Sequence, residues 1–182
     1  MQTYEDYYRN LVFPFFHGKV KITVNNNKTR KIDDLVKAII HEKRKEQHHK
    51  IDGNNEHKRF YTGLLGEAAL EEYFSIDIID WSANISKYYN NADLNKIGLN
   101  IGVKTAELWK FPIIHKNAIR PELINVKISD NIVVFFGLAS KDVLNKYQTD
   151  DFILSPSLKS RGTKTAFYGF SELKLITDLK KL

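Results

Sequence analysis

Apolar side chains recur at helical spacing at the start of the chain and then change to a shorter period. Over residues 3–16 aromatic and aliphatic side chains follow a helical repeat that is ended by Pro14, which predicts an aromatic-rich N-terminal helix. Residues 19–24 alternate between polar and apolar side chains, and this period of two predicts a short strand. The next apolar stripe has a helical period again, so we expect a helix capped by Asp33 or Asp34.

The middle of the chain combines one more helical repeat with several β-rich runs. A helix is predicted for residues 58–74, and β-branched and aromatic residues favour strands at 76–81, 92–94, 99–108 and 132–138. Residues 120–128 are ambiguous, because Pro121 suits the first turn of a helix whereas the β-branched residues after it suit a strand. We favour a short helix there.

The last part of the chain predicts two helices and a basic loop. The helices are expected at residues 141–147 and 171–182, the second of them amphipathic, and the loop at 159–164. No internal repeat or low-complexity linker interrupts the chain. We therefore expect a single domain of the α/β (α+β) class.

The composition narrows the class of protein and of partner. A chain of 182 residues with 42% hydrophobic residues can bury a core and fold. The formal net charge of +6 and the pI near 9.3 favour a polyanionic partner. The absence of cysteine excludes disulfides, thiolate metal sites and a cysteine nucleophile. Since the sequence has neither a signal-peptide pattern nor an apolar run of membrane-spanning length, we expect a cytoplasmic protein with no membrane partner.

Two carboxylates and a lysine occur in an order that metal-dependent phosphodiester hydrolysis can use. Glu67 lies in the helix predicted for residues 58–74, whereas Asp93 and Lys104 lie in predicted strands. Hydrolysis requires a water in line with the leaving oxygen and neutralisation of charge on the phosphoryl oxygens. Mg²⁺ prefers oxygen ligands, and a lysine ammonium can orient the attacking water. These three residues are therefore candidate catalytic residues.

A helix with the motif G-E-x-A, then an aspartate, then the motif G-V-K resembles the core of the PD-(D/E)XK nuclease superfamily. Restriction endonucleases and phage or recombination nucleases belong to this superfamily. The resemblance covers about residues 58–138 and implies a restriction-endonuclease-like core, in which a central mixed β-sheet is flanked by helices. Residues 1–57 would then form an N-terminal helical region, and residues 139–182 a C-terminal extension.

The resemblance also implies a set of site residues. It assigns metal binding to Asp93 and Glu67 together with the carbonyl of Val103, and it assigns assistance of the attacking water to Lys104. The implied cofactor is Mg²⁺, with Mn²⁺ as an alternative. The chain departs from the family motif at Gly102, which stands where the second acid is expected.

Three glutamates are candidates to replace the acid that is absent at Gly102. We favour Glu67, because two glycines in its helix allow the helix to lie close to the sheet. Glu71 is the second candidate. Glu107 is the third, since it lies an odd number of residues beyond the motif lysine and faces the opposite side of a regular strand.

The expected function is that of a Mg²⁺-dependent DNA endonuclease from a bacterial or phage-infected cell. A homodimer is expected, because one site cuts one strand and a duplex has two. The basic residues expected to contact the nucleic-acid backbone are Lys43, Arg44, Lys159, Arg161 and Lys164. Two alternatives stay open: a nuclease fold that binds DNA without cutting it, and a structural protein that interacts through its aromatic N-terminal helix. RNA is an open alternative to DNA.

Overall fold

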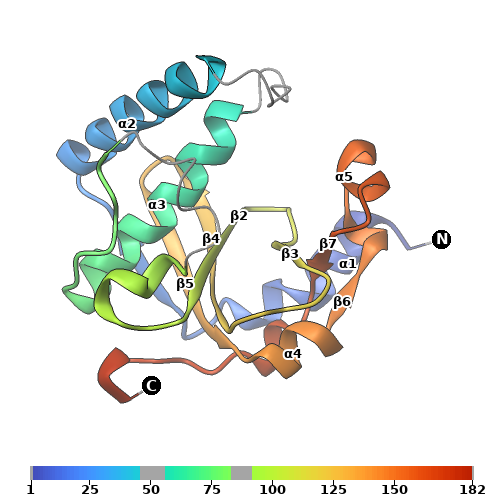
Figure 1. Ribbon diagram of the computed structural model, residues 1–182. Helices are drawn as coiled ribbons and strands as arrows, with labels where there is room; N and C mark the ends of the chain where they lie inside the picture. The colour runs from blue at the N-terminus through green and yellow to red at the C-terminus, as the bar shows by residue number, and fades with distance from the viewer. Residues whose placement is uncertain (1, 46–55, 83–91, 182) are drawn as a thin grey trace.

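The computed structural model describes residues 2–45, 56–82 and 92–181, and Figure 1 shows their arrangement. The α-helices are α1 (Tyr4–Leu11), α2 (Asn26–Lys45), α3 (Glu56–Phe74), α4 (Lys141–Lys146) and α5 (Pro156–Ser160). The strands are β1 (Val20–Thr23), β2 (Gly102–Glu107), β3 (Ile113–His115), β4 (Glu122–Ser129), β5 (Ile132–Ala139), β6 (Gln148–Thr149) and β7 (Lys164–Phe167). Short 3-10 helices are η1 (Phe13–Phe15), η4 (Asp93–Ile97), η5 (Asp150–Phe152), η6 (Phe170–Glu172) and η7 (Leu179–Lys181).

The strands form two sheets. The larger sheet has the order β1-β5-β4-β2, in which β2 runs parallel to β4 and the other neighbours are antiparallel. The smaller sheet is antiparallel, with the order β3-β7-β6. The described chain is therefore a mixed α/β structure with a mixed four-stranded sheet flanked by helices, as the sequence predicted.

The four-stranded sheet is buried on both faces, because alternate residues of its strands belong to two different cores. On β5, Phe135 packs with residues of α2 and α3, whereas Val134 and Phe136 pack with residues of α1 and the smaller sheet. Figure 1 shows α2 and α3 on one side of the larger sheet and α1 with the smaller sheet on the other. Burial on both faces explains why β5 is a nearly continuous apolar run.

The aromatic side chains of α1 are used within the chain. Tyr8 is fully buried, and the Tyr4 ring packs edge-on against Phe111 and Phe152, with centroid distances of 5.6 and 6.2 Å. Edge-to-face packing is a favourable arrangement of aromatic rings. This helix therefore contributes mainly to the second core of its own chain.

Several predicted elements are present with small shifts of their ends. α1, β1, α3, β2, β5 and α4 lie in the ranges expected for them. α2 begins earlier than predicted, at Asn26. The Lys28 backbone N–H donates to Asn25 Oδ1 at 2.9 Å, so Asn25 caps this helix and neither Asp33 nor Asp34 does.

The prediction of a helix over residues 120–128 is wrong, because strand β4 occupies most of this range. Leu123 packs in the core beneath α3, whereas Ile124 and Val126 pack in the opposite core. A strand presents alternate side chains to two faces, which a short helix in the same place could not do. Pro121 precedes the strand, and its carbonyl accepts a hydrogen bond from the Gly102 N–H at 3.0 Å.

Two further strand predictions are wrong for local reasons. Residues 76–81 form no strand, because the neighbouring helix α3 supplies a carboxylate that binds their backbone amides. Residues 92–94 lead into the 3-10 helix η4, which Gly98 ends in the left-handed conformation with φ of 81°. This conformation is accessible to glycine at little cost.

The amphipathic helix predicted for residues 171–182 is also absent over the described part of that range. The chain forms η6 and η7, and between them Lys174 makes a backbone bridge to Leu138. The apolar residues Leu173, Ile176 and Leu179 are buried. These three residues are apolar because they anchor an extended segment to the two cores, and they do not form the apolar face of a helix.

Candidate active site

A carboxylate from the neighbouring strand lies beside Gly102 of β2. Gly102 and Glu122 are the first residues of β2 and β4, and they are partners in the parallel ladder. A Cβ atom placed on Gly102 would lie 2.1 Å from Glu122 Oε2. The Glu122 carboxylate therefore occupies the space where a side chain at position 102 would begin. Glycine at this position is required for that arrangement.

The Glu122 carboxylate is buried beside a lysine. The residue is 8% exposed, and its Oε2 atom has no hydrogen-bond partner among the described residues. Lys104 Nζ lies 3.7 Å from Oε2. Burial raises the pKa of Glu122, and the positive charge of Lys104 opposes this rise. A buried carboxylate oxygen without a hydrogen bond is costly, which makes it a candidate ligand atom.

Asp93 closes the outer edge of the larger sheet. It is the first residue of η4, and its Oδ2 accepts a hydrogen bond of 2.5 Å from the Val103 N–H. The Leu94 N–H donates to the Ile101 carbonyl at 3.1 Å, which ties η4 to the residue that precedes β2. Because β2 is an edge strand, its outward amides need such partners. Asp93 thus has a structural role, and it also lies at the cavity described next.

Lys104 points to the same face of the sheet as Glu122. Its Nζ donates a hydrogen bond of 3.4 Å to the Val103 carbonyl. A small cavity is lined by Asp93, Gly102, Lys104 and Glu122, together with His115 and Arg120. Two carboxylates and a lysine are therefore brought together, with Glu122 in the position that the family motif assigns to residue 102.

Glu67 lies on the other side of Asp93. It is partly exposed on α3 and lines a separate cavity to which Asp93 also contributes. Burial raises the pKa of Glu67 to about 8, and the negative charges of Asp93 and Glu71 add to this effect while Lys104 opposes it. The charges of Asp93 and Lys104 thus affect the pKa of Glu67. The acid that lies beside Gly102, however, is Glu122.

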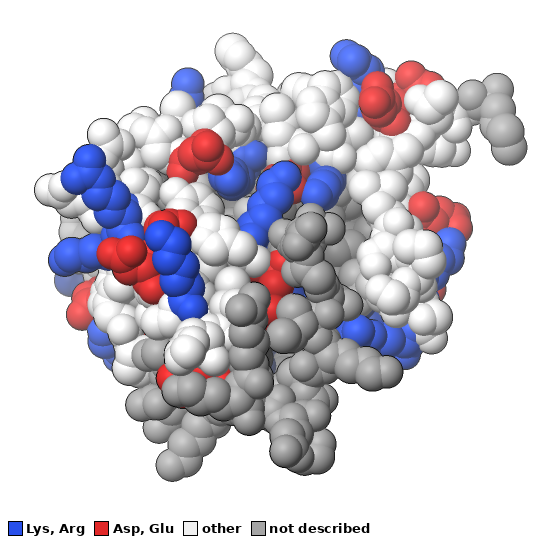
Figure 2. All heavy atoms as spheres, turned by 90° about the horizontal axis from the view of Figure 1, so that it is seen from above, with Lys and Arg blue, Asp and Glu red and all other residues white. Residues whose placement is uncertain are grey.

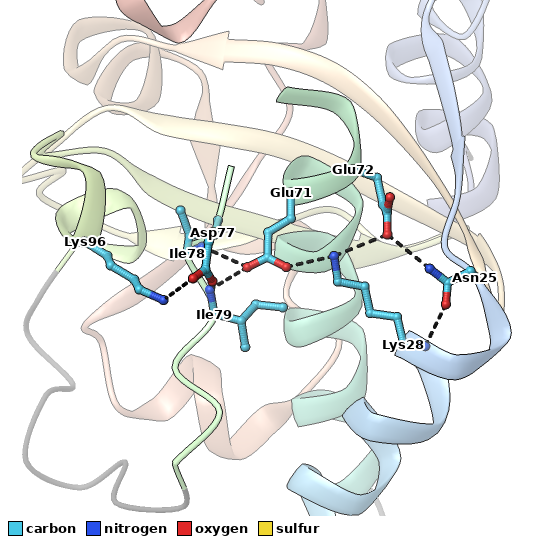
Figure 3. Close-up of polar contacts among 8 residues, drawn as sticks. All are labelled: Asn25, Lys28, Glu71, Glu72, Asp77, Ile78, Ile79 and Lys96. Atoms are coloured by element: carbon cyan, nitrogen blue, oxygen red, sulfur yellow. Dashed lines mark hydrogen bonds and ion pairs between the residues drawn. The ribbon is translucent and has the colours of Figure 1, made fainter. Parts of the chain in front are cut away.

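Glu71 is committed to a structural network, which Figure 3 shows. Its Oε1 accepts hydrogen bonds of 2.8 Å from the backbone N–H groups of Ile78 and Ile79, and its Oε2 lies 2.8 Å from Lys28 Nζ. The carboxylate thereby joins α3 to α2 and to the segment that follows α3. Glu71 is not in contact with the cavity at Gly102, so the structure gives no support to it as the replacement acid.

Glu107 is held by two lysines at the far end of β2. Its carboxylate lies 2.8 Å from Lys58 Nζ and 2.6 Å from Lys110 Nζ. The ladder between β2 and β4 runs without a register shift, so the alternation of β2 is regular and places Glu107 on the opposite face from Lys104. It does not line the cavity at Gly102.

The smaller sheet contributes an imidazole and a lysine beside the carboxylates. His115 of β3 and Lys164 of β7 are cross-strand partners, with Lys164 Nζ 2.5 Å from His115 Nε2. Burial lowers the pKa of Lys164 to about 8, with the charge of Lys104 adding to the effect and Glu122 opposing it. Burial and the charges of Lys164, Lys104 and Arg120 lower the pKa of His115.

Of the other basic residues predicted to bind nucleic acid, those whose side chains the structure describes do not line this cavity. Lys43 and Arg44 lie in α2, and their side chains are outside the described part of the structure. Lys159 is exposed on α5 and lies 4.0 Å from Asp151, and Arg161 is exposed at the end of the same helix. Among the predicted set, only Lys164 is placed near the carboxylates.

The donor atoms of the site suit a hard divalent cation. Asp93 and Glu122 offer carboxylate oxygens, one of them a buried Glu122 oxygen without a hydrogen bond, and the Val103 carbonyl accepts a hydrogen bond from Lys104. Mg²⁺ is often held by one or two carboxylates, with water and substrate phosphate completing the coordination. Over the described residues, no three histidine or acidic side chains already converge as a ligand set. The residues therefore fit a two-carboxylate site that substrate completes.

Sequence reasoning missed Glu122 because it followed the motif along one strand. The signal was present: a glycine replaces the acid, and the next β-branched run begins with a glutamate. No described helix is long and apolar enough to cross a membrane. No protein-family model, curated protein or solved structure matches the chain, so the likeness to the PD-(D/E)XK nucleases depends on the arrangement of Asp93, Glu122 and Lys104.

Proposed function

We propose that the protein is a divalent-metal-dependent DNA endonuclease of the PD-(D/E)XK type that acts as a homodimer. The observation that carries this proposal is the Glu122 carboxylate in the space above Gly102, 3.7 Å from Lys104. The family motif needs an acid two residues before the lysine. In this chain the acid comes from the adjacent strand, at the same place in the ladder.

Asp93 and Glu122 would hold Mg²⁺ or Mn²⁺, with the Val103 carbonyl and Glu67 as further oxygen donors. The bound ion supplies neutralisation of charge on the phosphoryl oxygens and favours ionisation of the attacking water. Asp93 is fixed by its bond to the Val103 amide, so one of its oxygens remains for a ligand. The rigid parallel ladder fixes Glu122 relative to Asp93, which is the preorganisation that such a site requires.

Lys104 would orient the attacking water and stabilise the phosphate. Its ammonium lies 3.4 Å from the Val103 carbonyl oxygen and 3.7 Å from Glu122 Oε2, and it lines the cavity. In the reaction, water oxygen forms a bond to phosphorus while the bond to the leaving sugar oxygen breaks. The water gives up a proton, and the leaving oxygen gains one.

The test is cleavage of supercoiled plasmid with Mg²⁺ and with Mn²⁺. Asp93→Asn, Glu122→Gln and Lys104→Ala should each reduce the rate by about 10²–10³-fold, because each removes a charge at the reacting phosphate. Glu172→Gln changes an exposed acid on η6 and should cut at the normal rate. Full activity in Glu122→Gln would contradict the assignment of this glutamate, and activity in all three variants would contradict the function.

A further inference from the structure

A second cavity adjoins the small cavity that is lined by Asp93, Lys104 and Glu122, which we call the active-site cavity. It lies between α3, β2 and the smaller sheet, and Lys104 lines both cavities. Its charged lining residues are Lys58, Arg59, Lys104, Lys110, Lys164 and Glu107. We call this cavity the lysine groove. Figure 2 looks down on the molecule from above and shows Lys and Arg side chains gathered near the middle of that face.

The lysine groove has a strong excess of positive charge. Five cationic side chains and one carboxylate, that of Glu107, line it, while Arg59 also lies 3.7 Å from Glu56 and Lys104 also lies 3.7 Å from Glu122. The Nζ atoms of Lys58 and Lys110 lie 2.8 and 2.6 Å from the oxygens of the Glu107 carboxylate. Two positive charges are therefore paired with one negative charge. Lys164 contacts His115, whose lowered pKa keeps it uncharged at neutral pH. The remaining excess of positive charge favours the binding of an anion.

A buried hydroxyl without a hydrogen-bond partner is a second indication that the lysine groove binds a ligand. Thr62 of α3 lines the groove and is 5% exposed. Its Oγ1 atom has no hydrogen-bond partner among the residues that the structure describes. A buried hydroxyl without a partner carries a desolvation cost, which a hydrogen bond to a ligand oxygen would remove. This observation is independent of the charges.

We propose that the lysine groove binds the nucleotide next to the scissile phosphate, with Lys58, Lys110 and Lys164 contacting its phosphate oxygens. The proposal rests on the proposed nuclease function, because it takes the adjoining cavity as the place of hydrolysis. The groove encloses about 470 Å³, within the range of small-ligand sites, which suits one nucleotide of a single strand. Lys164 belongs to β7, so the C-terminal part of the chain takes part in substrate binding.

The proposal is tested by binding, separately from cleavage. The Kd of a short fluorescent single-stranded oligonucleotide is measured by anisotropy in EDTA over a series of salt concentrations. Lys164→Gln should raise the Kd about three- to tenfold at low salt and should reduce the slope of log Kd against log salt by about 0.7–1. Lys21→Gln removes an exposed lysine from β1, at the opposite edge of the larger sheet, and should change neither quantity.

A second variant predicts a change in the opposite direction. Glu107→Gln releases Lys58 and Lys110 from their shared carboxylate, so the oligonucleotide should bind about three- to tenfold more tightly. A loss of folding could not produce tighter binding. If Lys164→Gln and Glu107→Gln both bind like Lys21→Gln, the lysine groove is not a nucleic-acid site.

Hydrolysis of bis(p-nitrophenyl) phosphate separates this proposal from the nuclease function. This diester has no neighbouring nucleotide, so its hydrolysis by the wild-type protein, compared with cleavage of plasmid DNA, reports the reaction at Asp93, Glu122 and Lys104 without the lysine groove. If the wild-type protein hydrolyses neither substrate but the binding changes occur, the nuclease proposal fails and the lysine groove stands as a binding site. If the wild-type protein hydrolyses both and the binding changes do not occur, only the groove proposal fails.

Discussion

At the scale of single residues, the candidate site depends on an exchange of side chains between two strands. The space beside the glycine on β2 is filled by the side chain of the glutamate on β4. A glutamate on β2, with a small residue on β4, would fill the same space. A Cβ on Gly102 would lie 2.1 Å from Glu122 Oε2, so a side chain at position 102 would require the Glu122 carboxylate to move. The residues at positions 102 and 122 are therefore coupled.

This exchange predicts a rescue. Glu122→Gly should abolish metal-dependent cleavage, and Gly102→Glu alone should destabilise the fold because it forces two carboxyl groups into one space. The double variant, Gly102→Glu with Glu122→Gly, returns the acid to β2 and should recover a measurable part of the plasmid-cleavage rate. Gly102→Gln with Glu122→Gly is the matched control, since it has the same shape without the charge. Equal rates in the two double variants would mean that no carboxylate is needed there.

At the scale of elements, the sequence predicted the helices and strands that a regular period specifies. It did so for α1 and β1, where the period continues over most of the element. It failed where a distant partner decides the structure. Residues 120–128 carry Pro121 and a β-branched run, and only their position between β5 and β2 makes them a strand. The side chains of residues 76–81 are typical of a strand, but two of their backbone N–H groups donate hydrogen bonds to the Glu71 carboxylate.

The candidate site could be predicted in part for the same reason. Asp93 and Lys104 follow from a local motif, and both line the active-site cavity. Glu122 depends on the parallel register between β2 and β4, which is a long-range pairing that no local pattern contains. The cationic groups of β3 and β7 likewise become neighbours only through the pairing of His115 with Lys164.

The contact between α3 and β2 predicts opposite effects for two glycines of one helix. A Cβ on Gly66 would lie 1.7 Å from Thr105 Oγ1, whereas a Cβ on Gly63 would meet no atom within 4 Å. Gly66→Ala should therefore lower the free energy of unfolding by about 1–3 kcal/mol through overpacking. Gly63→Ala should raise it by about 0.5–1 kcal/mol, because alanine loses less entropy in a helix.

Urea unfolding measures both glycine changes on the same scale. Thr105→Ala added to Gly66→Ala removes the hydroxyl and should restore part of the lost stability, because the closest contact is to that oxygen. Equal stability of the Gly66→Ala and Gly63→Ala variants would show that α3 does not lie against β2 as described. Since α3 carries Glu67, the Gly66 contact also fixes the distance of this glutamate from the site.

At the scale of the whole molecule, the site lies where the larger and the smaller sheet adjoin. The larger sheet contributes Lys104 and Glu122, and the smaller sheet contributes His115 and Lys164. β1, from the N-terminal region, forms an edge of the larger sheet, and β7 forms the centre of the smaller one. The regions predicted as an N-terminal extension and a C-terminal extension are thus part of the same packed structure as the core at residues 58–138.

The concentration of acids on both sides of Asp93 predicts how stability changes with pH. Burial, together with the charges of Asp93 and Glu71, raises the pKa of Glu67 from an ordinary value of 4.5 to about 8. The folded protein therefore holds the proton of Glu67 more tightly than the unfolded chain does. The stabilisation from this proton is complete below pH 4.5 and is lost as the pH rises to about 8.

Glu67→Gln keeps the shape of the protonated side chain and cannot ionise. In EDTA, the melting temperatures of the variant and the wild-type protein should be close near pH 4.5, and the variant should melt at a higher temperature near pH 8. Each kcal/mol of difference corresponds to roughly 2–4 °C for a chain of this size. Glu72→Gln, on the exposed side of the same helix, is the control and should show no such trend. A wild-type protein that gains stability relative to Glu67→Gln as the pH rises would place Glu67 in a solvated or cation-paired environment, in which Asp93 no longer repels it.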